Sequence, residues 1–168
     1  YFHIVFTVPH LLNGLIRQNR RVVFKVLFEA ASATLLKFGE HRLRARIGIT
    51  AILHTWSQTL FDHYHLHCIV TGGGLALDGH GWVRAAAHYL FPVKALSAMF
   101  RGKFIHGLRK QFDEGQLEFH GEVAALANPG AFEQLLHLAA SSKWVVYAKR
   151  PFAGPPQVLR YLSRYTHR

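Results

Sequence analysis

Histidine recurs at every second position in the segment His63-Tyr64-His65-Leu66-His67-Cys68. Successive side chains of a β-strand point to opposite faces, so His65 and His67 would share one face while Leu66 and Cys68 occupy the other. Two neutral imidazoles on a rigid strand can hold a divalent cation, and such a cation can polarise a phosphate. The segment therefore predicts a metal site backed by an apolar layer.

Two tyrosines near the end of the sequence are candidate nucleophiles. Tyr161 and Tyr165 are four residues apart, so on a helix they share a face. A phenol can attack phosphorus and form a covalent phosphotyrosine, although its ordinary pKa near ~10 makes it a weak nucleophile alone. Neighbouring guanidinium groups or a metal-polarised phosphate would offset that weakness. Two tyrosines at this spacing are commonly a surface feature, and the histidine pair is what favours the catalytic interpretation.

The charge balance indicates a polyanionic partner. The sequence has 20 Lys and Arg residues against 9 Asp and Glu, a formal net charge of +11 and a pI near 10.3. A ribosome-like basic protein would have the same balance, but here the cations are clustered, which favours a nucleic-acid substrate. The candidate nucleic-acid contacts are His54, Lys149, Arg150, Arg160, Arg164 and Arg168.

The length and the cysteine content limit the class of protein. A chain of 168 residues, 50% of them hydrophobic, can bury the core of one domain. The single cysteine, Cys68, excludes an internal disulfide and suits a reducing compartment. We find no signal peptide and no apolar run long enough to span a membrane, so we expect a cytoplasmic protein. Because the sequence opens on a strand-like segment and closes within a helical one, we interpret it as a piece of a longer protein.

The elements that would position these residues follow from the hydrophobic periodicity. Alternation predicts strands at 2–8, 44–56, 66–71, 82–86 and 144–149, and a 3.6-residue period predicts helices within 11–38, at 92–112, 131–140 and 157–168. We expect a break in the first helical region near Asn13 or Asn19, and a strand exit at Gly72 to Gly74. That glycine run is not a nucleotide-binding loop, because no Gly-Lys-Ser or Gly-Lys-Thr follows it. Together the elements predict one α+β domain over residues 1–168, an antiparallel sheet with packed helices.

Eight segments, in order along the chain, resemble the two-tyrosine rolling-circle transposases of bacterial insertion sequences. The triplet His65-Leu66-His67 matches the His-hydrophobic-His signature of the HUH single-strand endonucleases. The matching segments are 5–10, 53–56, 65–68, 72–75, 91–94, 100–104, 146–152 and 161–168. The resemblance implies an HUH endonuclease-like fold related to the RRM and palm folds. It also implies a zinc-binding region upstream and further sequence downstream in the full protein. Tyr64 stands where the family usually has proline.

The resemblance implies a specific reaction. Such proteins cut one DNA strand by tyrosine attack, which leaves a 5′-phosphotyrosine and a free 3′-OH, and no nucleotide cofactor is needed. Tyr161 and Tyr165 would carry the cleavage and transfer roles at the two transposon ends. His65 and His67 would be metal ligands for Mg²⁺ or Mn²⁺. The partners would be single-stranded DNA at the transposon ends and target, with no membrane, in a nucleoid-associated protein.

A third metal ligand is also expected from the resemblance. Gln58 is our first choice, because its carbonyl oxygen suits a hard ion, and His54 is the alternative. His54 could equally be a polar cross-strand or DNA-contacting residue. Asp62 and His63 are expected on a loop and Cys68 in the core. The other tyrosines, Tyr1, Tyr64, Tyr89 and Tyr147, are expected to be packing residues.

Three other functions remain open at this point. A replication initiator or a relaxase would share the chemistry of the transposase. A metal-dependent hydrolase would use bound water and a carboxylate base near the metal, although Asp and Glu are scarce here. A nucleic-acid-binding domain without catalytic activity would need neither Tyr161 nor Tyr165.

Overall fold

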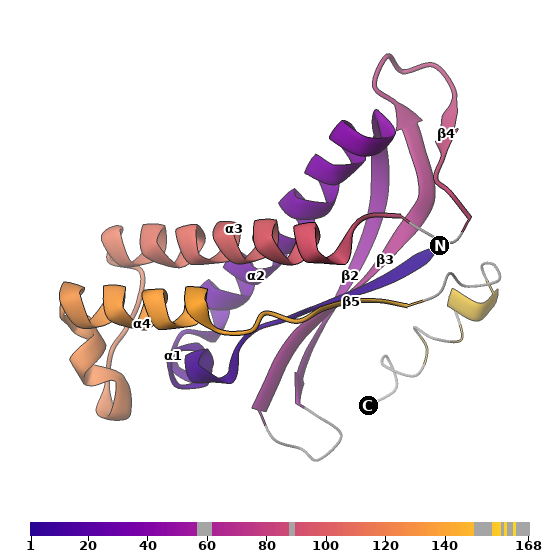
Figure 1. The fold of residues 1–168 in the computed structure, drawn as a ribbon. Helices are drawn as coiled ribbons and strands as arrows, with labels where there is room; N and C mark the ends of the chain where they lie inside the picture. The colour runs from indigo at the N-terminus through magenta and orange to yellow at the C-terminus, as the bar shows by residue number, and fades with distance from the viewer. Residues whose placement is uncertain (57–61, 88–89, 150–155, 159, 161–162, 164–168) are drawn as a thin grey trace.

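The computed structural model describes residues 1–56, 62–87, 90–149, 156–158, 160 and 163 (Figure 1). Five strands form one antiparallel sheet, with β4 paired to β3 at one end and the path β2-β3-β1-β5 across the rest. The strands are β1 (Phe2–Thr7), β2 (Ala45–Trp56), β3 (Asp62–Ala76), β4 (Trp82–Arg84) and β5 (Val146–Lys149). The helices are α1 (Asn13–Gln18), α2 (Arg20–Phe38), α3 (Val93–Asp113) and α4 (Pro129–Ser141). Short 3-10 segments lie at His10–Leu12 and Gly121–Ala127, and a π-helical turn at Gly39–Leu43. The predicted α+β class is confirmed.

One face of the sheet packs against helices, as the alternation of the strands requires. The buried residues of this face include Phe2, Ile4, Phe6, Leu66, Cys68 and Val70. Phe6 contacts Phe100 of α3 with ring centroids 4.7 Å apart, and Tyr64 contacts Phe24 of α2 at 5.7 Å. Burying aromatic and aliphatic side chains of this kind supplies the main driving force for folding. The alternate residues of the same strands consequently lie on the opposite face.

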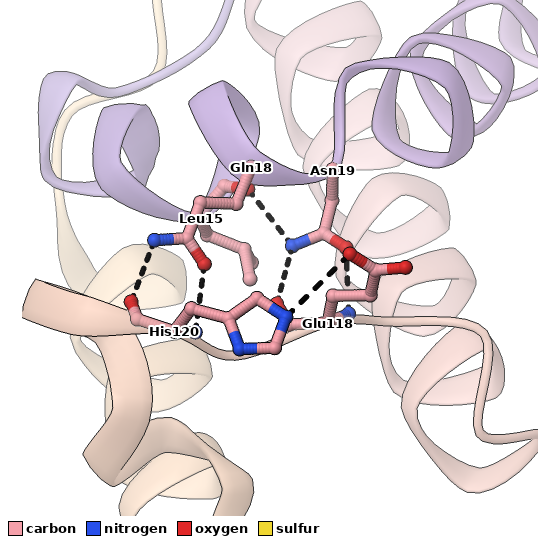
Figure 2. A network of polar contacts seen from close by, with 5 residues as sticks. All are labelled: Leu15, Gln18, Asn19, Glu118 and His120. Atoms are coloured by element: carbon pink, nitrogen blue, oxygen red, sulfur yellow. Dashed lines mark hydrogen bonds and ion pairs between the residues drawn. The ribbon is translucent and has the colours of Figure 1, made fainter.

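Asn19 divides the first helical region, as the sequence suggested, and joins it to a distant segment (Figure 2). Its side-chain amide donates to the carbonyl oxygens of Leu15 (3.1 Å) and Glu118 (2.9 Å), and its Oδ1 accepts from the Glu118 backbone N–H (2.7 Å). Gln18 makes a similar reciprocal pair with the backbone of His120, at 2.6 and 2.9 Å. These bonds satisfy backbone N–H and C=O groups of Glu118 and His120, which lie outside helices and strands. They also hold the segment before Gly121–Ala127 against the junction between α1 and α2.

The predicted strand exit at Gly72 to Gly74 is wrong, because β3 continues through these glycines to Ala76. The reason for the glycines is close approach of neighbouring strands. A Cβ at Gly74 would lie 2.3 Å from the carbonyl oxygen of Arg46, and one at Gly73 would lie 2.2 Å from that of Val83. Neither position has room for a side chain, since the obstacle in both cases is backbone.

The other predicted elements are confirmed within a few residues, with one difference at the start of β3. Asp62 and His63 were expected on a loop, but they lie inside β3, where Asp62 pairs with Trp56. Of the predicted helix at 157–168, the described residues 157, 158, 160 and 163 are helical. In the part of the chain that the structure describes, no helix combines the length and the apolar character needed to cross a membrane.

Candidate metal centre

Three histidines from two strands meet on the face of the sheet opposite the core. His54 of β2 lies directly across from His65 of β3, and His67 follows two residues later on the same face. The ring centroid of His54 lies 5.1 Å from that of His65 and 4.2 Å from that of His67. One ligand nitrogen from each of the three residues lies within 4.8 Å of the other two. The strand pairing therefore brings His54 to the predicted pair.

The hydrogen bonds of His65 and His67 identify their coordinating nitrogens. Nδ1–H of His65 donates to the backbone carbonyl oxygen of His63 at 2.8 Å. Nδ1 of His67 is hydrogen-bonded to Nε2 of His3 at 2.7 Å. Both bonds use Nδ1, which makes Nε2 the coordinating nitrogen of each ring, and such bonds fix ring orientation.

A fourth histidine, His3, lies against the cluster and was not among the predicted site residues. His3 lies on β1, where its Cα pairs with Ile69 of β3, so its side chain is diagonal to His67. It is 1% exposed, and its ring stacks on that of His67 with centroids 5.0 Å apart. The alternation of Phe2, His3 and Ile4 already placed His3 on the polar face. Which strand would lie beside β3 could not be inferred from that pattern.

The environment of the cluster keeps the imidazoles in the form that binds metal. Burial lowers the pKa of His54 below the ordinary value of 6.5. Burial also lowers the pKa of His65, with a smaller contribution from neighbouring His54 and an opposing one from the His63 carbonyl. A lowered pKa favours the neutral ring at physiological pH, and only the neutral ring has a lone pair to donate.

The three histidines fit a divalent cation. Two nitrogens bound to one tetrahedral ion at about 2.0–2.1 Å each lie about 3.4 Å apart, so nitrogens within 4.8 Å of one another must approach by about 1.4 Å or less to share an ion. Small side-chain rotations close such a gap. An all-imidazole donor set suits transition metals better than Mg²⁺, which prefers oxygen ligands.

No carboxylate belongs to this cluster among the described residues. Asp62, the nearest acidic residue in sequence, instead pairs with Arg17 at 3.3 Å. A hydrolase that activates a bound water needs a general base within reach of it. The arrangement therefore does not favour the hydrolase interpretation.

The histidines continue beyond the cluster toward the start of β3. The His63 ring lies 4.9 Å from that of His65, and its Nδ1 is 3.3 Å from Nε2 of His10. On the core side, Cys68 is fully buried, and burial raises the pKa of its thiol to about 12, so the prediction that Cys68 is a core residue is confirmed. Tyr64 is buried as expected. The expectation that Tyr1 and Tyr147 are packing residues is wrong, because they are 42% and 55% exposed.

Several predicted site residues lie outside the part of the chain that the structure describes. These are the candidate nucleophiles Tyr161 and Tyr165, the candidate ligand Gln58, and Arg150, Arg164 and Arg168. Tyr89 also lies outside it. Among the remaining candidates, Lys149 ends β5, where its Cα pairs with His3, and Arg160 is exposed.

Fold and site together define an α+β protein with a three-histidine centre suited to a metal ion. Residues 48–168 match the family model Y2_Tnp, which is described as "Putative transposase". The chain belongs to this transposase family, which confirms the resemblance to transposases seen in the sequence.

Two curated relatives are similar over nearly the whole chain. "Putative transposase y4qJ" of Sinorhizobium fredii (strain NBRC 101917 / NGR234) is 45% identical over 170 residues, which cover 100% of this chain and 43% of that protein. The transposase for insertion sequence element IS801 of Pseudomonas savastanoi pv. phaseolicola is 28% identical over 163 residues, 97% of this chain and 38% of that protein. The chain thus spans less than half the length of these relatives.

Solved structures of the conjugative relaxase TrwC are similar at low sequence identity. The metal-bound complex of TrwC with oriT DNA has a TM-score of 0.49 and 15% identity, covering 98% of this chain and 69% of that chain. The complex with mutant oriT DNA has a TM-score of 0.49 and 16% identity, covering 96% and 71%.

Proposed function

We propose that this chain is the catalytic domain of a DNA transposase that cuts and joins single strands through a 5′-phosphotyrosine. The observation that carries the proposal is the cluster of His54, His65 and His67 on the polar face of the sheet, in a chain that belongs to a transposase family. The net charge of +11 supports DNA as the substrate. Domain bounds of 1–168, a cytoplasmic, nucleoid-associated location and independence of nucleotide cofactors belong to the same proposal.

We assign the metal ligands as His54, His65 and His67, with Gln58 as a further candidate. A bound divalent cation would supply Lewis-acid polarisation of the scissile phosphate. Of the two ions that the resemblance implies, Mn²⁺ is better suited than Mg²⁺ to imidazole nitrogens. His3 and the His63 carbonyl hold two of the rings in orientation through the bonds at 2.7 and 2.8 Å.

The covalent step is assigned to Tyr161 and Tyr165. The phenolic oxygen gives up its proton and forms a bond to phosphorus while the bond from phosphorus to the 3′-oxygen breaks. The 3′-oxygen takes up one proton and leaves as a 3′-OH, so no proton is gained or lost overall. The energy of the phosphodiester is kept in the phosphotyrosine, so attack by a second 3′-OH reverses the chemistry and joins the strands. Lys149, Arg150, Arg160, Arg164 and Arg168 are the proposed phosphate contacts.

A covalent-adduct assay tests this function. The natural-length protein is incubated with Mn²⁺ and labelled single-stranded DNA that carries the element's end, and adducts are resolved under denaturing conditions. We expect an adduct that Tyr161→Phe combined with Tyr165→Phe abolishes. Tyr64→Phe is the matched control, because it removes a phenol from the core face of the same domain, on the opposite side of the sheet from the histidines, and should leave the adduct intact. An undiminished adduct in the double variant would refute the assigned nucleophiles.

The metal assignment has its own test in the same assay. Alanine at His54, His65 or His67 should reduce both the adduct and the binding of Mn²⁺ measured by calorimetry. A DNA-binding domain without catalytic activity would form no adduct in any variant. If His54→Ala leaves Mn²⁺ affinity unchanged, then His54 is not a ligand, and a Gln58→Ala variant becomes the decisive comparison.

A further inference from the structure

A basic groove lies at the outer edge of the sheet, where α3 meets the segment leading into β5. It encloses about 390 Å³ between the two elements. Ser97 of α3 donates a hydrogen bond to the carbonyl oxygen of Trp144 at 3.1 Å, and Trp144 Nε1 donates to that of Ala139 at 2.7 Å. The first bond joins the two walls and the second ties Trp144 to α4, so the groove is built into the packing of α3 and α4 against the segment before β5.

Three cations line this groove, which we call the α3–β5 groove: Lys94, Arg101 and Lys143. Its described lining contains no carboxylate, and none of the three cations takes part in an ion pair between described residues. Elsewhere on the same helix, Arg109 and Lys110 pair with Glu133 and Glu114 at 2.6 and 3.7 Å. The groove cations therefore differ from their neighbours in lacking an anionic partner.

The spacing of the cations suits a polymer rather than one small anion. Lys94 and Arg101 lie seven residues apart on one face of α3, which corresponds to about 10 Å along the helix axis. Between them the same face carries only the small side chains of Ser97 and Ala98. The start of α3 at Val93 has no side-chain cap, so its first backbone N–H groups add positive potential at this end.

The groove lies level with the histidine centre along the strands. Phe6 of β1 pairs on one side with Val146, which lines the groove, and on the other with Leu66, which lies between His65 and His67. Two strand spacings, about 10 Å in all, separate β5 from β3. The histidines and α3 lie on opposite faces of the sheet, and β5 ends the strand path β2-β3-β1-β5. A strand bound at the histidines therefore reaches the groove by passing around the edge of the sheet at β5.

We propose that the α3–β5 groove binds the phosphodiester backbone of the DNA strand whose scissile phosphate lies at the histidine centre. The groove cations contact phosphates that flank the cleavage site: Lys94, Arg101 and Lys143. They take no part in the cleavage chemistry itself. The proposal rests on the proposed function for the identity of the strand. It predicts that DNA length and salt, rather than the sequence of the bases, govern the contribution of the groove.

The test compares two variants with the same loss of charge in the natural-length protein. The groove variant is K94Q/R101Q/K143Q, and the matched control is R21Q/K37Q/R42Q, which removes three exposed cations elsewhere. Affinity for labelled single-stranded DNA is measured by fluorescence anisotropy over a range of salt. Each phosphate contact on a single strand contributes about 0.7 to the slope of log affinity against log salt. We expect the groove variant to lose about 2 from that slope and the control to lose none.

Three further comparisons make the outcome decisive. The charge-conserving variant K94R/R101K/K143R should keep the wild-type slope, whereas equal slopes in the groove and control variants would overturn the proposal. Equal losses for a mononucleotide and a long strand would also overturn it, because they would indicate a small-anion site. The covalent adduct on an oligonucleotide confined to the cleavage site should survive in the groove variant. The two proposals can fail separately. If the wild type forms no adduct but the groove variant still shows a smaller salt dependence of DNA affinity, the proposed function is refuted and DNA binding by the groove is supported.

Discussion

The hydrogen bond between His3 and His67 gives a prediction that separates positioning of a ligand from support of the fold. Replacing His3 by phenylalanine keeps a ring of similar size beside His67 but removes the bond to its Nδ1. Both partners are buried, His3 at 1% and His67 at 9% exposure, and the bond is 2.7 Å long. Water therefore cannot easily replace the lost partner.

The expected magnitude follows from two independent considerations. A buried polar atom deprived of its partner costs about 1–3 kcal/mol. Loss of a group that orients a metal ligand typically weakens metal affinity about 10–100-fold, which corresponds to roughly 1.4–2.8 kcal/mol. We therefore expect His3→Phe to weaken Mn²⁺ binding by about 10–100-fold, and His3→Gln to recover part of it, because an amide can hydrogen-bond to Nδ1.

Calorimetric titration with Mn²⁺ and unfolding with and without the ion supply the assay. The stabilisation conferred by a ligand grows with its concentration relative to the dissociation constant. The gap between the metal-loaded and metal-free free energies of unfolding should therefore shrink in His3→Phe. His106→Phe, on the exposed side of α3, is the control and should leave the gap unchanged. An equal loss of stability in both states with unchanged Mn²⁺ affinity would show that His3 supports the fold alone.

Three further predictions concern the fold and its dependence on pH. Burial lowers the pKa of His54 and His65 below 6.5. In the metal-free folded state these two side chains are therefore protonated at a lower pH than in the unfolded chain. The resulting stability should be complete above about pH 6.5 and decline below it, as urea unfolding in a chelator would reveal; a flat profile would contradict this. Asn19→Ala should cost about 1–2 kcal/mol by chemical denaturation, because it removes the partner of the partly buried backbone groups of Glu118, and a cost under about 0.5 would contradict that role. Gly102→Ala, in open space on α3, should stabilise by up to about 1 kcal/mol. Gly107→Ala should instead destabilise by about 1–3 kcal/mol, because its Cβ would meet a side chain of α2 at 2.6 Å, and a shared sign for the two would refute that account.

Periodicity predicted the histidine face because each strand is buried on one side only. The alternation that places Leu66 and Cys68 in the core necessarily places His65 and His67 on the opposite face. His54 was the alternative third ligand, and the antiparallel pairing of β2 with β3 sets it across from His65. The histidine face depends on a local pattern, and local patterns are what a single sequence contains.

Features that depend on the order of the strands in the sheet could not be predicted from the sequence. The sequence placed His3 on a polar face, but only the pairing of β1 with β3 makes that face the same as that of His67. The glycine run of β3 was misinterpreted for a related reason. Gly73 and Gly74 lack side chains because the backbone of Val83 and of Arg46 approaches them closely. Those two residues lie on the neighbouring strands, so the need for glycine depends on strand pairing.

The distribution of the histidines over three strands has a consequence for folding. β2 supplies the ligand His54, β3 supplies the ligands His65 and His67, and β1 supplies His3, which orients His67. The oriented ligand set therefore exists only when all three strands are paired. An unfolded chain cannot assemble these nitrogens around one ion. The free energy of metal binding therefore adds to the free energy of folding. Because β1 also pairs with β5, metal binding should favour the same pairing that positions the α3–β5 groove at the edge of the sheet, level with the site.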